Sequence, residues 1–140
     1  METINHEYYV SLEVAKLLKE AGFDWKVRYM YRNNNPTLCI CTETPYRNIP
    51  KFNKCPMSWQ YAAPTLEIAQ KWLREVKDID VYIFPTTNNK RGCVYEWGIK
   101  TFGRALWVEG QPSTAQYETY EEAQEAGIKK VLEIISKKGD

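Results

Sequence analysis

The fold is decided by three short stretches, Ser11-Leu12-Glu13-Val14-Ala15, Thr65-Leu66-Glu67-Ile68-Ala69 and Thr119-Tyr120-Glu121-Glu122-Ala123, which begin 54 residues apart. In each stretch the Ser or Thr can accept hydrogen bonds from free backbone N–H groups of a first helical turn, and the Glu two residues later favours the positive end of the helix dipole. Only the third has a further carboxylate, Glu122, where a full capping box requires it. The pattern predicts three helix starts. Replacement of any of these N-caps by Ala is expected to cost about 0.5–2 kcal/mol of stability.

An amphipathic pattern follows each start. Leu12, Ala15 and Leu18 form one stripe and Gly22 is a suitable C-cap, so the first helix is predicted from about residue 12 to residue 21. The apolar stripes of the other two are Leu66, Ala69, Trp72, Leu73 and Val76, and Tyr120, Ala123, Gly127, Val131, Ile134 and Ile135. The equal spacing is only weak support for an internal duplication, because the segments between the starts do not align.

Strand-forming segments fill the intervals between the helices. Residues 25–32 and 37–42 flank the turn-forming run 33–36 and predict a hairpin. Three further strands are predicted at 79–84, 93–100 and 105–109. The predicted order is αββαβββα, and helices on one face of a mostly antiparallel sheet fit this order best. Residues 1–140 are therefore expected to form a single α+β domain.

Charge and composition exclude several classes of protein. Nineteen Lys and Arg against eighteen Asp and Glu leave a formal charge of +1, so no global field attracts nucleic acid or an anionic membrane. No apolar run approaches the length of a signal peptide or of a membrane span, which predicts a cytoplasmic protein that makes no membrane contact. In that compartment the four cysteines are expected to be reduced thiols.

Residues that could support catalysis or metal binding are few. The only histidine, His6, lies in a terminal segment expected to fray, so no Ser-His or Cys-His pair is indicated. The glycines form neither a phosphate-binding loop nor a dinucleotide fingerprint. Cys39 and Cys41 point to one face of a strand and could bind zinc with Cys55 and Cys93, but zinc knuckles normally lie on turns. We therefore expect small buried thiols, no metal and no cofactor.

A carboxylate pair is the one catalytic alternative. A two-residue turn at Phe102-Gly103 would place Glu96 opposite Glu109 and Trp107 over the bare backbone of Gly98. Two carboxylates that face each other across an antiparallel strand pair repel each other, which lowers stability unless they are solvated, bridged by a cation or sharing a proton. Exposure to water is the simpler expectation, and an acid–base pair would require that face to be a cleft.

A family resemblance adds context but no mechanism. The motifs 61–75 and 119–128, with the opening Tyr9-Val10-Ser11, resemble a large family of small uncharacterised proteins encoded by gut anaerobes and by their phages or integrated elements. The resemblance covers most of the chain and is weakest in the middle strands. It implies an accessory role in a bacterial or phage cytoplasm, and it carries no activity, ligand or catalytic residue.

The expected function is noncatalytic binding of a macromolecular partner, most simply a protein. The long segment 43–64 has no convincing period but carries aromatic residues, as functional loops often do. Its residues Tyr46, Trp59 and Tyr61, together with Arg28 and Arg32 on the neighbouring strand, are the candidate partner-binding residues.

Two other function classes stay open. One is a small-molecule or nucleotide-binding enzyme that uses Glu96 and Glu109. The other is a nucleic-acid-binding module, which is disfavoured because the third helix begins with carboxylates that would repel phosphate. A helix-turn-helix is excluded because the segment after the first helix is predicted to be a strand.

Overall fold

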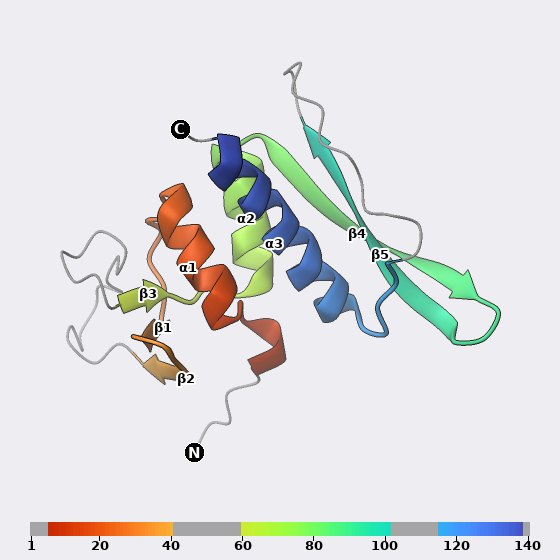
Figure 1. The fold of residues 1–140 in the computed structure, drawn as a ribbon, viewed down its shortest axis with the longest axis horizontal. Coiled ribbons are helices and arrows are strands. Elements are labelled where there is room, and N and C mark those ends of the chain that lie inside the picture. Colours follow the sequence, from red (N-terminus) through yellow and green to blue (C-terminus); the bar gives the residue numbers. More distant parts are fainter. Residues whose placement is uncertain (1–5, 41–59, 102–114, 139–140) are drawn as a thin grey trace.

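A computed structural model describes residues 6–40, 60–101 and 115–138 of the chain (Figure 1). The helices are α1 (Leu12–Ala21), α2 (Leu66–Val76) and α3 (Tyr120–Lys138), and a 3₁₀ turn, η1 (His6–Tyr8), precedes them. The strands are β1 (Tyr29–Arg32), β2 (Asn35–Ile40), β3 (Gln60–Ala62), β4 (Ile79–Asn88) and β5 (Gly92–Thr101). The predicted α+β class is confirmed.

All three predicted N-caps are confirmed. Ser11 Oγ accepts a hydrogen bond from Val14 N–H at 3.2 Å, and Thr65 Oγ1 accepts one from Ile68 N–H at 3.2 Å. The third helix has the full capping box: Thr119 Oγ1 accepts from Glu122 N–H at 3.0 Å, and a Glu122 carboxylate oxygen accepts from Thr119 N–H at 3.1 Å. At the other end of α1, Gly22 has a φ of 98°, a left-handed conformation that suits a residue without a Cβ. Local capping chemistry therefore places the helices.

The strands differ from the prediction in extent. β1 begins only at Tyr29, and β2 already includes Asn35, so the first turn is shorter than predicted. Asn33, at this turn, has a φ of 52°, which Asn tolerates better than most residues. The short strand β3 was not predicted, and it pairs with β1 on the side opposite β2. The predicted strand 105–109 lies outside the described residues.

The expectation of one sheet is wrong, because the described strands form two separate antiparallel sheets. One has the order β2-β1-β3 and the other is the β4–β5 hairpin. The helices stand between them: α1 contacts β3, whereas α2 and α3 contact β4 (Figure 1). A single hydrophobic core joins these parts, since its buried side chains come from all three helices and from both sheets.

The core is built around large side chains from different elements. Trp72 of α2 is buried and meets Phe23 edge-on, with ring centroids 5.4 Å apart. Two residues that were placed on apolar stripes are instead exposed: Val76 at 50% and Tyr120 at 41%, because each lies at a helix end beyond the packed layer. None of the helices in the described ranges is both long and apolar enough to cross a membrane.

The β4–β5 hairpin is long and regular. Its register runs without interruption from Ile79 opposite Thr101 to Asn88 opposite Gly92, and its far end projects beyond the helices (Figure 1). The bare backbone at Gly98 is covered by Tyr82 of β4, whose Cζ would lie 2.2 Å from a Cβ added there. An aromatic cover had been predicted from Trp107, which lies outside the described residues.

The open edge of β4 is protected against the addition of another strand. Gln70 of α2 donates a hydrogen bond from Nε2 to the Val81 carbonyl at 2.8 Å, which occupies an acceptor on that edge. The backbone N–H and C=O of Tyr95 both bond to Tyr117 and therefore point away from β4. The backbone of Pro85, the partner of Tyr95 on β4, then faces the open edge, where Pro has no N–H to donate. Because these two positions cannot bond to a further strand, the β4 edge disfavours strand pairing with another chain.

Candidate functional site

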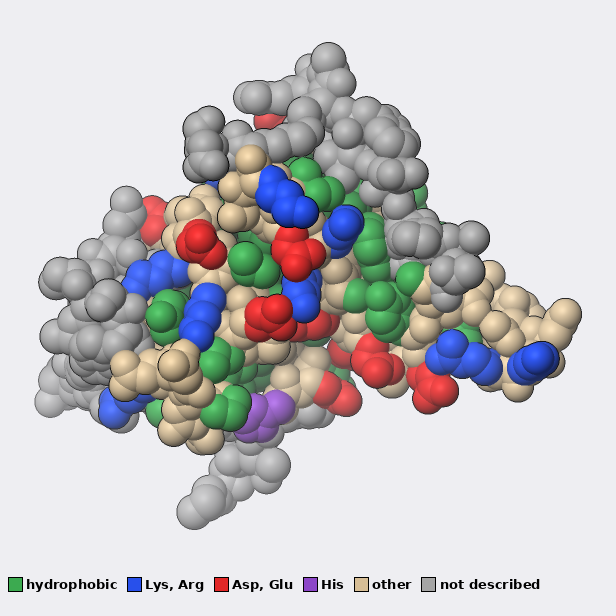
Figure 2. Space-filling model, in the orientation of Figure 1, with side chains coloured by type: hydrophobic (Ala, Val, Ile, Leu, Met, Phe, Trp, Pro, Cys, Tyr) green, Lys and Arg blue, Asp and Glu red, His purple; other side chains and the backbone are tan. Residues whose placement is uncertain are grey.

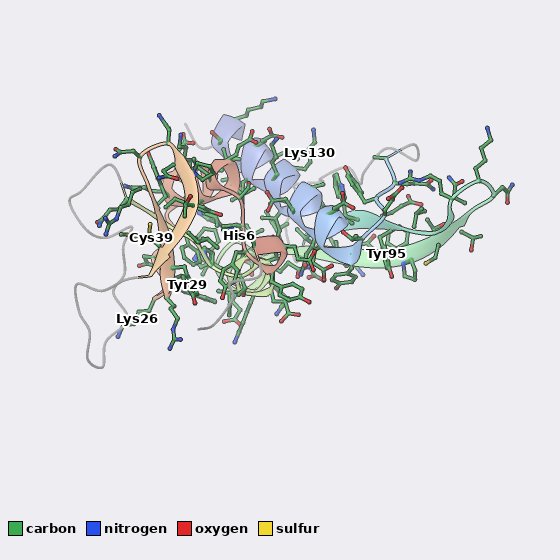
Figure 3. All side chains as sticks on the ribbon, turned by 90° about the horizontal axis from the view of Figure 1, so that it is seen from below. His6, Lys26, Tyr29, Cys39, Tyr95 and Lys130 are labelled. Carbon is green, nitrogen blue, oxygen red and sulfur yellow. The ribbon has the colours of Figure 1, made fainter. Side chains whose placement is uncertain are left out.

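The three helices begin at the same end of the molecule, and their first turns line two adjoining hollows. The wider hollow has a volume of about 650 Å³ and the narrower one about 320 Å³, and both are lined by Leu66 and Glu121. We call the two hollows together the helix-start groove. Seen from below, His6 lies between the small sheet, marked by Tyr29 and Cys39, and the hairpin, marked by Tyr95 (Figure 3). The groove therefore opens where elements distant in sequence meet.

Carboxylates and tyrosines dominate the described lining of this groove. The carboxylates are Glu7, Glu67, Glu121, Glu122 and Glu125, and the tyrosines are Tyr8, Tyr9, Tyr31 and Tyr120. No Lys or Arg is among the described residues that line the two hollows. Figure 2 shows acidic side chains gathered close to His6 on this side. A chain with a net charge near zero thus presents a locally acidic groove.

The acidity follows from the way the helices start. Glu67 lies in the first turn of α2, and Glu121 and Glu122 lie in the first turn of α3. A carboxylate in a first turn is stabilised by the positive end of the helix dipole. Because the helix starts lie close together, the first-turn glutamates of α2 and α3 are concentrated at one place.

The carboxylates differ in what already binds them. Glu122 is used by the capping box at Thr119. The side chains of Glu67 and Glu121 form no hydrogen bond or ion pair with any residue in the described ranges. The charges of these two side chains are therefore free for a ligand.

Glu125 is partly buried and accepts hydrogen bonds from Ser11 at the start of α1. Ser11 Oγ donates to Glu125 Oε2 at 2.5 Å, and Ser11 N–H donates to Oε1 at 3.3 Å. Burial raises the pKa of Glu125, and the hydrogen bonds from Ser11 and the charge of Lys129 oppose that shift. Lys129 itself pairs with Glu13, Nζ to Oε1, at 3.0 Å. Within the described part of the chain, Glu125 has hydrogen-bond donors but no ion-pair partner.

Tyr31 forms the wall next to Glu125. Its hydroxyl donates to the Val10 carbonyl at 2.6 Å. Burial, with a further contribution from the charge of Glu125, raises the pKa of Tyr31 to about 12. The phenol is therefore neutral at physiological pH, and the wall adds no charge to the groove.

Binding suits this arrangement better than catalysis. The contact between Ser11 and Glu125 could suggest an activated nucleophile, but the same hydroxyl oxygen accepts the capping bond from Val14 N–H. The capping bond engages one of the two lone pairs of the Ser11 oxygen and sets the orientation of the hydroxyl at the helix start. We therefore read Ser11 and Glu125 as a link between α1 and α3.

Those predicted partner-binding residues that the structure describes lie in or beside the β2-β1-β3 sheet. Tyr46 and Trp59 are outside the described residues. Tyr61 is half-buried on β3, and the Nζ atoms of Lys16 and Lys19 lie 5.6 and 5.0 Å from the centroid of its ring. Two cations from α1 thus already lie close to the Tyr61 ring, which indicates a structural role for Tyr61.

The predicted arginines are exposed near Tyr61. Arg32 ends β1, where it is paired with Gln60 of β3, and Arg28 precedes β1. The structure therefore places Arg32 and Tyr61 in one sheet and Arg28 directly before its strand β1. With Lys16 and Lys19 also near Tyr61, these surroundings are basic, whereas the helix-start groove is acidic.

The catalytic and metal alternatives gain no support from the described residues. Glu96 is half-buried on β5 and accepts a hydrogen bond from Gln116 Nε2 at 3.4 Å, and its predicted partner Glu109 lies outside the described ranges. The part of the chain that the structure describes has no group of three residues placed to hold a metal ion. The expectation of buried thiols is wrong for Cys93, which is exposed near the tip of the hairpin, and Cys39 is half-buried.

The sequence did not reveal the groove, although it held the signal. The first-turn glutamates were visible in the three repeated stretches, but no local pattern shows that three helices start side by side. In comparisons with known proteins, no family model, no curated protein and no solved structure matches this chain.

Proposed function

We propose that this protein is a noncatalytic binding module that takes a positively charged segment of a protein partner into the helix-start groove. The observation that carries the proposal is the pair of carboxylates without partners among the described residues, Glu67 and Glu121, in a groove that lacks Lys and Arg on its described lining. Charges of one sign in a hollow with low-dielectric walls attract ligands of the opposite sign.

The shape of the groove supports a peptide segment as ligand. The two hollows adjoin at Leu66 and Glu121, so the groove extends across the starts of all three helices. Exposed Tyr8 and Tyr120 stand along it, and tyrosine is enriched in protein interfaces because its ring combines an apolar body with a polar tip. A nucleic acid is disfavoured here because its phosphates would meet the carboxylates.

A peptide titration tests the proposal. The probe is a fluorescein-labelled peptide of alternating Arg and Gly, and its matched control alternates Glu and Gly. Fluorescence anisotropy should rise with the basic peptide alone. Binding should weaken as salt is raised, because screening acts on exposed charges.

Matched variants test whether the basic peptide binds in the helix-start groove. The double variant Glu67→Gln and Glu121→Gln removes two negative charges from the groove. The control, Glu20→Gln and Glu75→Gln, removes two exposed charges nearer the other ends of α1 and α2. The groove variant should lose most of its affinity and the control should keep it. Equal losses in both variants, or equal binding of the acidic peptide, would refute the proposal.

A further inference from the structure

The two halves of the groove differ in the carboxylate that they contain. Of the two hollows, only the wider one is lined by Glu125, which is partly buried, accepts two hydrogen bonds from Ser11 and has no ion-pair partner in the described ranges. Partial burial removes water from this carboxylate, and a cation beside it would offset that cost. The place for such a cation at Glu125 is open to the wider hollow.

Part of the lining of the wider hollow is apolar or aromatic. Tyr9, Tyr31, Leu12 and Pro36 line the same hollow. A cation that enters it must give up part of its hydration and pack against rings. This requirement distinguishes between the two basic side chains that a protein partner can offer.

We infer that the wider hollow is an arginine pocket, in which one arginine side chain of the partner lies against the tyrosine wall with its guanidinium directed at Glu125 and Glu121. The inference rests on the proposed function and names the chemistry of its anchor. A guanidinium is planar, stacks on aromatic faces and is more weakly hydrated than an ammonium. Its five donors can also serve more than one carboxylate, whereas the lysine ammonium is a compact, strongly hydrated charge.

The two acceptors proposed for the guanidinium lie one helical turn apart. Glu121 and Glu125 are four residues apart on α3, a spacing that places both side chains on one face of the helix. Each carboxylate can accept from a different N–H group of one flat guanidinium, whereas a compact ammonium uses such a pair less well.

Three capped amino acids test the inference on the whole chain. The probes are the N-acetyl, N-methylamide derivatives of arginine, lysine and citrulline, and citrulline is the neutral isostere of arginine. Affinities are measured by NMR titration of the ¹⁵N-labelled protein. The arginine probe should bind about three-fold more tightly than the lysine probe, in line with a cation–π contact, and the citrulline probe should not bind measurably.

A conservative variant locates the contact. Glu125→Gln keeps the shape of the side chain and removes its charge, so the affinity for the arginine probe should fall about ten-fold, as expected for a charge-assisted hydrogen bond. Glu20→Gln, nearer the other end of α1, is the control and should leave the affinity unchanged. Thermal melts of both variants verify that they are folded.

The outcomes separate this inference from the proposed function. Equal affinities for arginine and lysine, or an unchanged affinity in Glu125→Gln, would overturn the arginine pocket while the binding of basic peptides stands. Binding of citrulline equal to that of arginine would also overturn it, because charge would then play no part. Failure of the basic peptide itself to bind would remove the proposed function and the pocket together.

Discussion

Ser11→Ala should destabilise the protein much more than Thr65→Ala, although both substitutions remove an N-cap. Each loses the capping hydrogen bond, worth about 1 kcal/mol. Ser11 also donates its hydroxyl to the partly buried Glu125 carboxylate, and a hydrogen bond to a charged group adds about 1.5–3 kcal/mol. The expected costs in unfolding free energy are therefore about 2.5–4 kcal/mol for Ser11→Ala and about 1 kcal/mol for Thr65→Ala.

The pH dependence of the difference identifies its cause. Burial raises the pKa of Glu125 above its ordinary value of 4.5. A carboxyl group with a raised pKa stabilises the folded state below pH 4.5, and this contribution is lost as pH rises through the raised pKa. The hydroxyl of Ser11 binds the ionised form most strongly. The extra cost of Ser11→Ala should therefore be full at neutral pH and should shrink in acid as Glu125 becomes protonated in the folded state.

Urea denaturation followed by tryptophan fluorescence measures these free energies. Experiments at pH 7 and at pH 4 on the wild type, Ser11→Ala and Thr65→Ala give the comparison. In the Glu125→Gln background, the double-mutant cycle should remove the extra cost of Ser11→Ala. Equal costs for Ser11→Ala and Thr65→Ala at neutral pH would refute the link between Ser11 and Glu125.

Four further outcomes are expected. Gly127→Ala should lower the free energy of unfolding by about 1 kcal/mol in urea melts, although Ala has the better helix propensity. The added Cβ would lie 2.7 Å from Val81 Cγ1, and such overpacking costs about 1–3 kcal/mol. A stabilised variant would contradict this packing. Tyr31→Phe should lose about 1–3 kcal/mol at pH 7, since the Val10 carbonyl loses its buried donor. In the wild type, the stability that Tyr31 contributes should persist to pH 10 and decline through its raised pKa of about 12, which alkaline denaturation compared with Tyr31→Phe can check. A chelator should leave the melting temperature unchanged if the thiols bind no metal, and release of stoichiometric zinc would show otherwise.

The parts of the fold that local chemistry determines could be predicted from the sequence. The helix starts at Ser11, Thr65 and Thr119 and the left-handed C-cap at Gly22 were identified from single residues and their spacing. These signals need no knowledge of distant contacts, because a cap satisfies backbone groups within its own turn. The prediction succeeded where the physics is local.

The features that depend on long-range pairing were missed. The three-residue strand β3 gives too short a pattern to recognise, and it exists because it pairs with β1. The division into two sheets follows from packing of the helices between them, which periodicity does not encode. Glu125 was not singled out because its partner, Ser11, is 114 residues away in the sequence.

The most direct measurement is chemical-shift mapping of the ¹⁵N-labelled protein during titration with the unlabelled Arg-Gly peptide. If the helix-start groove binds basic segments, the shifted backbone signals will cluster at residues 6–12, 65–67 and 119–125, and they will reverse when salt is added. Shifts centred on Arg28, Arg32 and Tyr61, or along the β4–β5 hairpin, with the helix starts unchanged, would contradict this assignment.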